Sequence, residues 1–334
     1  MTEENSTTSQ LSVAMTTTGV TPITGGNTLM SSPSRTIFQC AVLIIGVVGI
    51  ATNAIILYAL VASKQHKKHG LIVHQNAIDL FSSFFIFITY SLKLCNIYLT
   101  GYVGYWLCKL ILSDSLTWCG AICSVINLAI ITVERYLKVV HPIWSKNKLR
   151  NWMMYSAMAF AWIVSFISNV VVVFPAKAVI DGACYGFAMW KNKTDVLIYF
   201  VWNFVLFYVV ELFIFIFCYW RILIVLRRQA RVMAGHSAAA GPSTTKVLSM
   251  QMQANVIKTM VFISAFYAVS WLPCYVYFLH LNLSPNPTLN DGGFYACVSV
   301  AFMYLGTNPF IYAIKFEPVK QVLLRLILCR KTGE

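Results

Sequence analysis

Three acidic residues inside long apolar stretches are the first groups in this chain that are able to do chemistry. They are Asp79, Asp114 and Glu211. A carboxyl group in apolar surroundings binds a small cation, exchanges a proton or forms a structural hydrogen bond, because an isolated charge there is costly. Glu211 must therefore be protonated or partnered, and both a ligand- or proton-sensing role and a neutral structural role stay open. The three acids do not form a file down one helix, which a transporter or channel would use as a polar path.

Patterns typical of enzymes and metal sites are absent from the apolar stretches. They contain no pair of catalytic Asp motifs, no HExxH and no GxSxG. The ten cysteines show no C-x-x-C or Cys/His spacing of the kind that binds a metal. We therefore expect a protein that is not an enzyme, with no metal and no cofactor.

Seven apolar stretches carry these residues, and each is long enough to cross a bilayer as a helix, which takes about 20 residues. Continuous apolar runs favour helices, because a membrane barrel would need short alternating segments. The composition agrees, with 58% hydrophobic and 11% charged residues. We predict an all-α membrane protein, a seven-transmembrane helix bundle. The seven runs are Thr36 to Ala62, Leu71 to Leu94, Cys108 to Val133, Trp152 to Ala176, Val196 to Ile222, Val256 to Leu281 and Phe294 to Ile314.

The distribution of positive charge predicts the orientation of the bundle. Of the 25 Lys and Arg residues, eighteen fall on one side of the seven runs, six fall on the other, and Arg135 lies at the boundary. Because cytoplasmic loops carry the excess of Lys and Arg, the amino end is expected outside and the carboxyl end in the cytoplasm. The net charge of +14 then faces anionic membrane lipid and needs no nucleic-acid partner. We expect a multi-pass protein of the plasma membrane.

The chain divides into three parts. Residues 1–34 are rich in Ser, Thr, Gly and Asn and read as a disordered extracellular tail without a cleavable signal peptide, so the first span is expected to act as its own insertion signal. Residues 35–315 hold the seven spans. Residues 316–334 are expected to form a short amphipathic eighth helix and a short cytoplasmic tail.

Several positions are candidates for modification. Asn5, Asn192 and Asn282 begin glycosylation acceptor patterns on segments assigned to the outside, and the third is the weakest because Pro285 follows it. Cys329 follows the apolar face of the predicted eighth helix, so it is a palmitoylation candidate.

Each span carries one or two residues that hydropathy alone does not explain. Taken in order, these residues resemble the motifs of the rhodopsin-like (class A) G-protein-coupled receptors, and the resemblance covers roughly Thr36 to Cys329. One motif alone is weak evidence, whereas the ordered set on seven spans is highly specific. The set comprises Gly49 and Asn53, Asp79, Glu134-Arg135-Tyr136, Trp162, Cys218-Tyr219, Trp271-Leu272-Pro273, and Asn308-Pro309-Phe310-Ile311-Tyr312.

The resemblance implies a polar core in mid-membrane. Its members are Asn53, Asp79, Ser124 and Asn308. In the family the matching Asp anchors a sodium ion, and a structural hydrogen bond from Asp79 to Asn53 and Asn308 is the compatible alternative. The position that often completes the sodium shell is Tyr304 here, which is too bulky to be an ordinary ligand. We therefore predict a site that binds sodium weakly or not at all.

The resemblance also implies an activation switch at the inner end of the bundle. Arg135 is held by Glu134 at rest and then turns toward Tyr219, Tyr312 and the G protein. The family's extra acidic partner is replaced by Gln253, so we expect measurable basal activity. Pro273 and Pro309 each remove a backbone hydrogen bond and provide hinges, Trp271 sits where the family places its ligand-sensing aromatic residue, and Tyr136 completes the motif around Arg135.

The outer end is expected to hold the ligand. The resemblance implies a disulfide between Cys108 and Cys184, and Cys108 to Arg135 spans about two residues more than is usual. Counting from either end places Ser115 or Thr117, and not Asp114, where amine receptors have their Asp, which disfavours an amine. Retinal is disfavoured because the seventh span has no Lys. The predicted pocket comprises Asp114, Thr117, Trp118, Trp271, Tyr275, Phe278 and Phe302.

The resemblance thus implies a receptor that binds an extracellular peptide or small molecule and activates heterotrimeric G proteins, with arrestin and a receptor kinase as further partners. Glu211 stands where the fifth helix of the family usually has a Pro, which puts the usual bulge of that helix in doubt. The alternatives are a seven-helix transporter or channel and a non-signalling decoy receptor.

Overall fold

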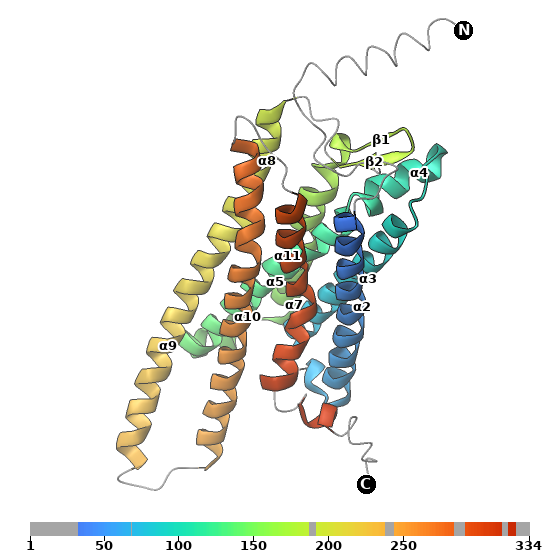
Figure 1. Cartoon of the computed structure of the whole chain (residues 1–334). Helices are drawn as coiled ribbons and strands as arrows, with labels where there is room; N and C mark the ends of the chain where they lie inside the picture. The colour runs from blue at the N-terminus through green and yellow to red at the C-terminus, as the bar shows by residue number, and fades with distance from the viewer. Residues whose placement is uncertain are drawn as a thin grey trace, which may run out of the picture.

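A computed structural model describes residues 33–67, 69–186, 192–237, 244–283, 291–315 and 320–324. Long helices run side by side along the molecule, and a small hairpin covers one end (Figure 1). The first run forms α2 (Pro33–Ala62), and the second forms α3 (Gly70–Leu94). The third forms α4 (Gly101–Leu107), η2 (Cys108–Leu112) and α5 (Ser115–Val140). The short helix α6 (Pro142–Lys148) connects to the fourth run, which forms α7 (Asn151–Phe166), η3 (Ile167–Val171) and η4 (Phe174–Ala176). The fifth run forms α8 (Lys193–Phe204), η5 (Val205–Val209) and α9 (Val210–Ser237). The last are α10 (Thr244–Leu283) and α11 (Asp291–Lys315), and the short elements are η1 (Gln65–Lys67), β1 (Ala178–Ile180) and β2 (Ala183–Tyr185).

The predicted helical bundle is confirmed. Within the described residues, six helical stretches are both long and apolar enough to cross a membrane. The seventh, α11, has 25 residues and packs against α2, α3 and α10. At 1.5 Å per residue it is also long enough to span the hydrocarbon core. The chain is therefore a multi-pass membrane protein.

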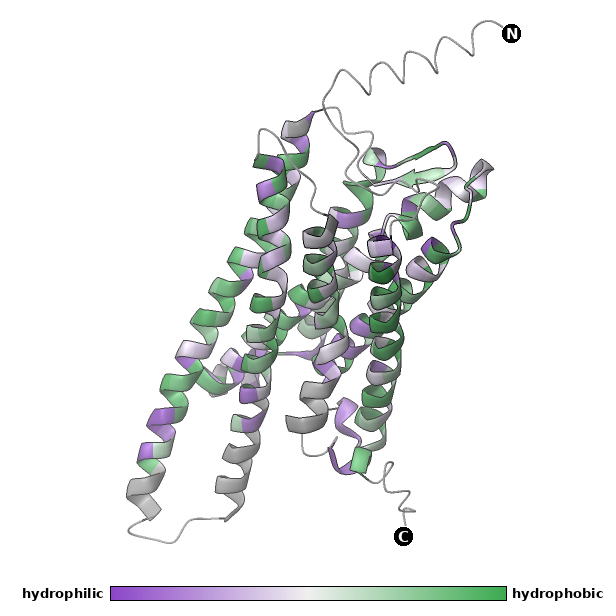
Figure 2. Cartoon of the chain, in the orientation of Figure 1, coloured by the Kyte–Doolittle hydropathy of each residue, from purple (hydrophilic) through white to green (hydrophobic). Residues whose placement is uncertain are grey.

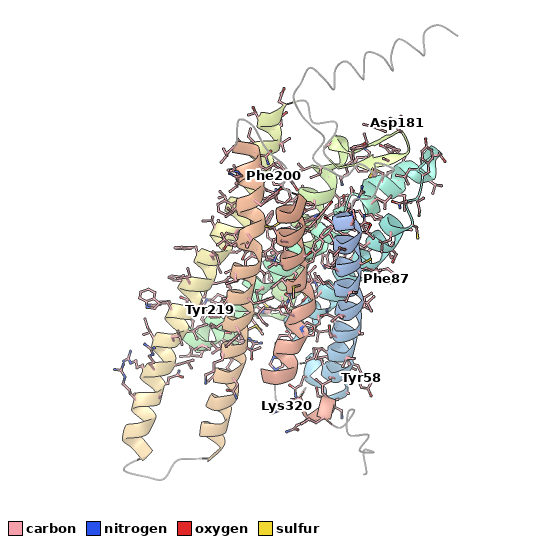
Figure 3. All side chains as sticks on the ribbon, in the orientation of Figure 1. Tyr58, Phe87, Asp181, Phe200, Tyr219 and Lys320 are labelled. Carbon is pink, nitrogen blue, oxygen red and sulfur yellow. A yellow bond between two sulfur atoms is a disulfide. The ribbon has the colours of Figure 1, made fainter. Side chains whose placement is uncertain are left out.

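Hydrophobic residues predominate along the helices at mid-height (Figure 2). Ile44, Phe213, Ile216 and Val269 are each at least 62% exposed. Such a surface would aggregate in water, but it matches the hydrocarbon of a bilayer. Asp181 and Lys320, which the charge count assigns to the outside and the cytoplasm, lie at opposite ends of the bundle (Figure 3).

Small residues allow the central helices to approach closely. A Cβ atom at Gly120 of α5 would lie 2.1 Å from the hydroxyl oxygen of Ser82, and one at Gly49 would lie 2.3 Å from that of Ser83. Close backbone approach at Gly is a common way for helices to associate in membranes. The contacts hold α3 between α2 and α5 and fix the polar side chains that α3 contributes to the interior.

The third span departs from a regular helix, and this explains the two extra residues between Cys108 and Arg135. A π-helical turn occupies Cys108–Leu112, and Asp114 then adopts a left-handed conformation with φ of 59°. A π turn takes up more residues per turn than an α-helix, and Asp tolerates positive φ better than most residues. The irregular segment accommodates the two extra residues, so the helix that follows, from Ser115 to Val140, is regular.

The fifth span carries the bulge that the missing proline put in doubt. Val205–Val209 form a π-helical turn that ends two residues before Glu211. The hydroxyl of Tyr267 on α10 donates to the carbonyl of Phe207 inside this turn. The bulge is therefore supported by a side chain of the neighbouring helix, which the sequence of the fifth span by itself does not indicate.

Candidate functional site

A polar cluster occupies the interior at mid-height. Asp79 is fully buried, and it accepts hydrogen bonds from the Ser124 hydroxyl at 2.7 Å and from the Asn308 amide at 2.9 Å. The structure thus brings together three of the four residues predicted for the polar core. The fourth, Asn53, donates to the carbonyls of Gly49 at 2.9 Å and Leu305 at 3.3 Å and forms no hydrogen bond with Asp79.

Gln75 is a further member of this cluster that sequence reasoning missed. Its amide nitrogen lies 3.3 Å from each carboxyl oxygen of Asp79 and also donates to the Ser124 hydroxyl. The amide nitrogen thus contacts the same oxygens that would surround a small cation. The signal in the sequence was a polar residue one helical turn before Asp79, on the same face of α3.

The cluster continues from Gln75 toward the fourth span. The Asn127 amide donates to Gln75 at 2.8 Å, His74 lies 2.9 Å from the Asn127 carbonyl oxygen, and Trp162 donates to His74 at 3.0 Å. Because Trp162 only donates, the other ring nitrogen of His74 carries the proton toward Asn127. A chain of hydrogen bonds therefore joins Trp162 on α7 to Asp79 on α3.

Arg135 lies at the other end of α5 from the hairpin. Its Nε atom is 3.3 Å from Glu134, and an Nη atom donates to His69 at 3.2 Å. Lys138 reaches the other oxygen of Glu134 at 2.5 Å, so two cations share one carboxylate. The pairing between Arg135 and Glu134 that the resemblance implies is present, and its sharing with Lys138 was not foreseen.

Among the described side chains, neither Tyr219 nor Tyr136 forms a hydrogen bond with Arg135. The Tyr219 hydroxyl lies 2.9 Å from Thr132 and 3.1 Å from Ser264, and so bridges α5 and α10. The Tyr136 hydroxyl lies 3.3 Å from His141. The side chains of Tyr312 and Gln253 lie outside the described residues.

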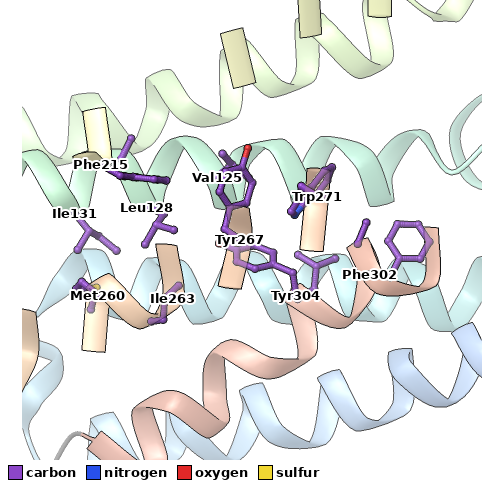
Figure 4. Packing of buried hydrophobic residues seen from close by; sticks show 14 of the residues in the cluster. Val125, Leu128, Ile131, Phe215, Met260, Ile263, Tyr267, Trp271, Phe302 and Tyr304 are labelled. Carbon is purple, nitrogen blue, oxygen red and sulfur yellow. The ribbon is translucent and has the colours of Figure 1, made fainter. Parts of the chain in front are cut away.

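Aromatic side chains fill the space between the two ends. Trp271 is 2% exposed, and its ring centre lies 5.8 Å from that of Trp118 and 6.0 Å from that of Tyr267. Tyr267 in turn packs against Tyr304 at 5.6 Å. Figure 4 shows Trp271, Tyr267 and Tyr304 packed together between the helices. Pro273 and Pro309 lie inside the same two helices, α10 and α11.

A cavity opens above Trp271, with a volume of about 740 Å³ that includes the open space at its mouth. Four predicted pocket residues line it, namely Trp118, Trp271, Tyr275 and Phe278. The other lining residues are Ser113, Ser115, Ile122, Asn169, Val173, Lys177, Gly186, Tyr199, Phe200, Asn203 and Cys274.

Three predicted pocket residues lie outside the cavity wall. Asp114 is turned toward α3 by its left-handed backbone and pairs with Lys93 at 2.5 Å. Thr117 is 1% exposed, and Phe302 packs behind Trp118 with ring centres 5.4 Å apart. Asp114 is therefore already neutralised and does not present a free carboxylate to the cavity.

A hairpin closes part of the outer end. β1 and β2 pair antiparallel, with Asp181 and Gly182 at the turn, both at positive φ. This is the geometry that Asp-Gly turns favour, and the dipeptide was the signal that sequence reasoning missed. The predicted disulfide is confirmed, since Cys184 of β2 is bonded to Cys108. It fixes the hairpin to the start of the third span.

Lys177 precedes the hairpin and lies in the cavity wall. It is 2% exposed, and its ammonium group donates to the Lys109 carbonyl at 3.1 Å and to the Ser115 hydroxyl. Burial and the charge of Lys109 lower the pKa of Lys177, and Asp114 partly opposes them, so that the pKa is about 8. Sequence reasoning assigned Lys177 only to the outer loops, because its burial depends on how the loop folds back.

The remaining predicted positions are placed as follows. Glu211 is 5% exposed, and one of its carboxyl oxygens has no hydrogen-bond partner among the described residues.

Among the glycosylation candidates, Asn192 is exposed at the start of α8. Asn282 is 6% exposed and donates to the Phe278 carbonyl at 2.8 Å, which is unfavourable for a glycan. Residues 320–324 are helical. Asn5 and Cys329 lie outside the described residues.

A family model described as the seven-transmembrane receptor of the rhodopsin family matches residues 52–312. The chain belongs to this family. The predicted recognition is thereby confirmed, and the receptor is a member of a family of membrane receptors rather than of enzymes.

Individual relatives are distant. The galanin receptor type 1 of Rattus norvegicus is 23% identical to this receptor over 239 residues, which cover 70% of this chain and 65% of the relative. The somatostatin receptor type 5 of Rattus norvegicus is 24% identical over 302 residues, 87% of this chain and 77% of the relative. The trace amine-associated receptor 1 of Macaca mulatta is 24% identical over 251 residues, 69% of each. The receptor therefore matches slightly less than two thirds of the length of the galanin receptor.

Proposed function

We propose that the protein is a G-protein-coupled receptor of the plasma membrane that binds an extracellular ligand in the cavity above Trp271. Binding is transmitted to the inner end, where release of Arg135 allows a heterotrimeric G protein to bind and exchange its nucleotide. One observation carries the proposal: Trp271 is both a wall of the cavity and part of the aromatic packing that continues through Tyr267 to Tyr304. A ligand that displaces Trp271 must therefore disturb the packing beside the polar cluster.

The distribution of charge supports the proposed orientation. The cavity and the hairpin lie at the end with few Lys and Arg residues, and Arg135 lies at the end with many. We therefore place the amino end outside and the carboxyl end in the cytoplasm. The domain limits of residues 1–34, 35–315 and 316–334 and the acylation of Cys329 are part of the same proposal.

The ligand class that the relatives favour is a peptide, since galanin and somatostatin receptors are among them. The similarity to a trace amine-associated receptor suggests an amine as the second candidate. The pairing of Asp114 with Lys93 at 2.5 Å opposes the amine, because an amine needs a free carboxylate.

The test is basal nucleotide exchange. The full-length protein is expressed with a panel of Gα subunits, and exchange is compared between the wild type and Arg135→Ala at equal surface expression. The proposal expects exchange on at least one Gα subunit that Arg135→Ala abolishes. Equal exchange in both proteins would contradict it, and substrate flux or ionic current in place of exchange would favour a transporter or channel.

A further inference from the structure

Positive charge outweighs negative charge around the outer cavity. Within the described residues, Lys177 lines the cavity, Lys109 lies next to Lys177, and Lys93 pairs with Asp114, the one carboxylate whose charge acts on Lys177. Lys109 and Lys177 are 6% and 2% exposed. A buried ammonium group is costly unless an anion or several hydrogen bonds compensate for the lost water. The three ammonium groups therefore have too little negative charge around them to compensate for their burial.

The three lysines differ in their partners. Lys93 pairs with Asp114 at 2.5 Å and lies over the ring of Tyr90. The Lys109 ammonium group donates to the Phe174 carbonyl at 2.7 Å and lies 4.6 Å from the centre of the Phe174 ring. Lys177 has two neutral acceptors, the Lys109 carbonyl and the Ser115 hydroxyl. An ammonium group has three N–H donors, so Lys177 retains one for a further acceptor.

Lys177 is also the lysine that lines the cavity. Its neighbours in the wall are the hydroxyls of Ser113 and Ser115, and aromatic side chains, including Trp118, Trp271 and Phe278, form other parts of the wall. The cavity therefore combines a cationic, hydroxyl-bearing part with an apolar, aromatic part. Such a surface fits an elongated molecule with an acidic group on one end and an apolar body.

We infer that the ligand of this receptor carries an acidic group, which Lys177 receives through its remaining N–H donor. The hydroxyls of Ser113 and Ser115 beside it already donate to the carbonyl of Lys109. The inference rests on the proposed function, because it takes the cavity as the ligand site. The same arrangement disfavours a cationic ligand, since it would meet Lys177 in the wall and find Asp114 paired with Lys93.

The test measures binding of matched probes to the purified full-length receptor in phosphatidylcholine nanodiscs, without G protein. The probes are 4-phenylbutyrate, 4-phenylbutyramide and 4-phenylbutylamine, which share a body and differ in charge, and binding is followed by saturation-transfer NMR. The carboxylate is expected to bind at least about tenfold more tightly than the amide, because hydrogen bonds to charged groups are the stronger ones. The amine is expected to bind most weakly.

Variants assign the preference to one side chain. Lys177→Gln should remove the difference between carboxylate and amide, Lys177→Arg should keep it, and Lys146→Gln, which removes the same charge from the exposed inner surface, should leave it unchanged. If Lys177→Gln does not fold, the relative affinities of the three probes for the wild-type receptor still test the inference. Equal binding of carboxylate and amide, or a preference for the amine, would overturn the inference.

A second pair of probes separates the sources of the acidic group. N-acetyl-Leu-Phe with a free carboxylate, compared with its amide, represents a peptide terminus, and phenylbutyrate represents a small carboxylic acid. Tighter binding of either acid than of its amide supports the inference and identifies the source. Exchange activity without any acid preference would refute this inference alone, whereas acid preference without nucleotide exchange would refute only the proposed signalling.

Discussion

Lys138 is expected to weaken the contact between Arg135 and Glu134, which we propose keeps the receptor at rest. Its ammonium group lies 2.5 Å from one oxygen of Glu134, while Arg135 lies 3.3 Å from the other. Both cations draw on the same negative charge. Replacing Lys138 with Gln leaves the whole carboxylate to Arg135, so the resting arrangement should become more stable and basal nucleotide exchange should fall.

The size of the effect follows from exposure. The Lys138 side chain is 41% exposed, so its pair belongs with surface ion pairs, which contribute about 0.2 to 1 kcal/mol. A change of that size alters a two-state population by up to about fivefold. Arg135 and Glu134 are 14% and 8% exposed, so breaking their contact with Glu134→Gln should cost about 1 to 3 kcal/mol. Glu134→Gln should therefore raise basal exchange by about 5- to 150-fold, with the opposite sign to Lys138→Gln.

The assay is GTPγS exchange in membranes that contain the receptor and one responsive Gα subunit, with surface expression matched between variants. Lys146→Gln serves as the control, because it removes one positive charge from the same exposed inner surface without contact to Glu134. An increase in exchange in Lys138→Gln would refute the reasoning. So would an unchanged rate in Lys138→Gln alongside an increase in Glu134→Gln, since sharing of the carboxylate would then have no energetic effect.

Further outcomes are expected elsewhere in the molecule. Basal nucleotide exchange of the wild type should not respond to sodium. Gln75→Leu removes the amide that contacts Asp79, so exchange by this variant should become sodium-dependent. Strong sodium dependence of the wild type that Asp79→Ala abolishes would contradict this prediction. Binding of 4-phenylbutyrate should weaken as the pH rises through about 8, where Lys177 with Lys109 and Asp114 around it loses its proton. Lys177→Arg should show no such loss, and an identical pH profile in both proteins would contradict the assignment. Cys184→Ala should remove ligand binding or surface expression, as measured by antibody labelling of intact cells, because the hairpin loses its attachment to the third span.

The sequence by itself determined the fold class and the family. Apolar length and the excess of Lys and Arg on one side are local or additive properties, so they need no knowledge of which helices touch. The pairing of Arg135 with Glu134 was also accessible, because adjacent residues at a helix end stay close in any packing. Cys108 and Cys184 were assigned through the resemblance, and the structure agrees.

Only the tertiary structure decided the contents of the two sites. The left-handed Asp114 and the π turn before it absorb two residues and turn a carboxylate away from the cavity toward Lys93. The burial of Lys177 and the contact of Gln75 with Asp79 depend on side chains that come from separate helices and loops. A pattern along one segment reports its exposed and buried faces, but the partner of a polar group is set by the neighbouring segment, and that partner determines whether the group holds the bundle together or is left for a ligand.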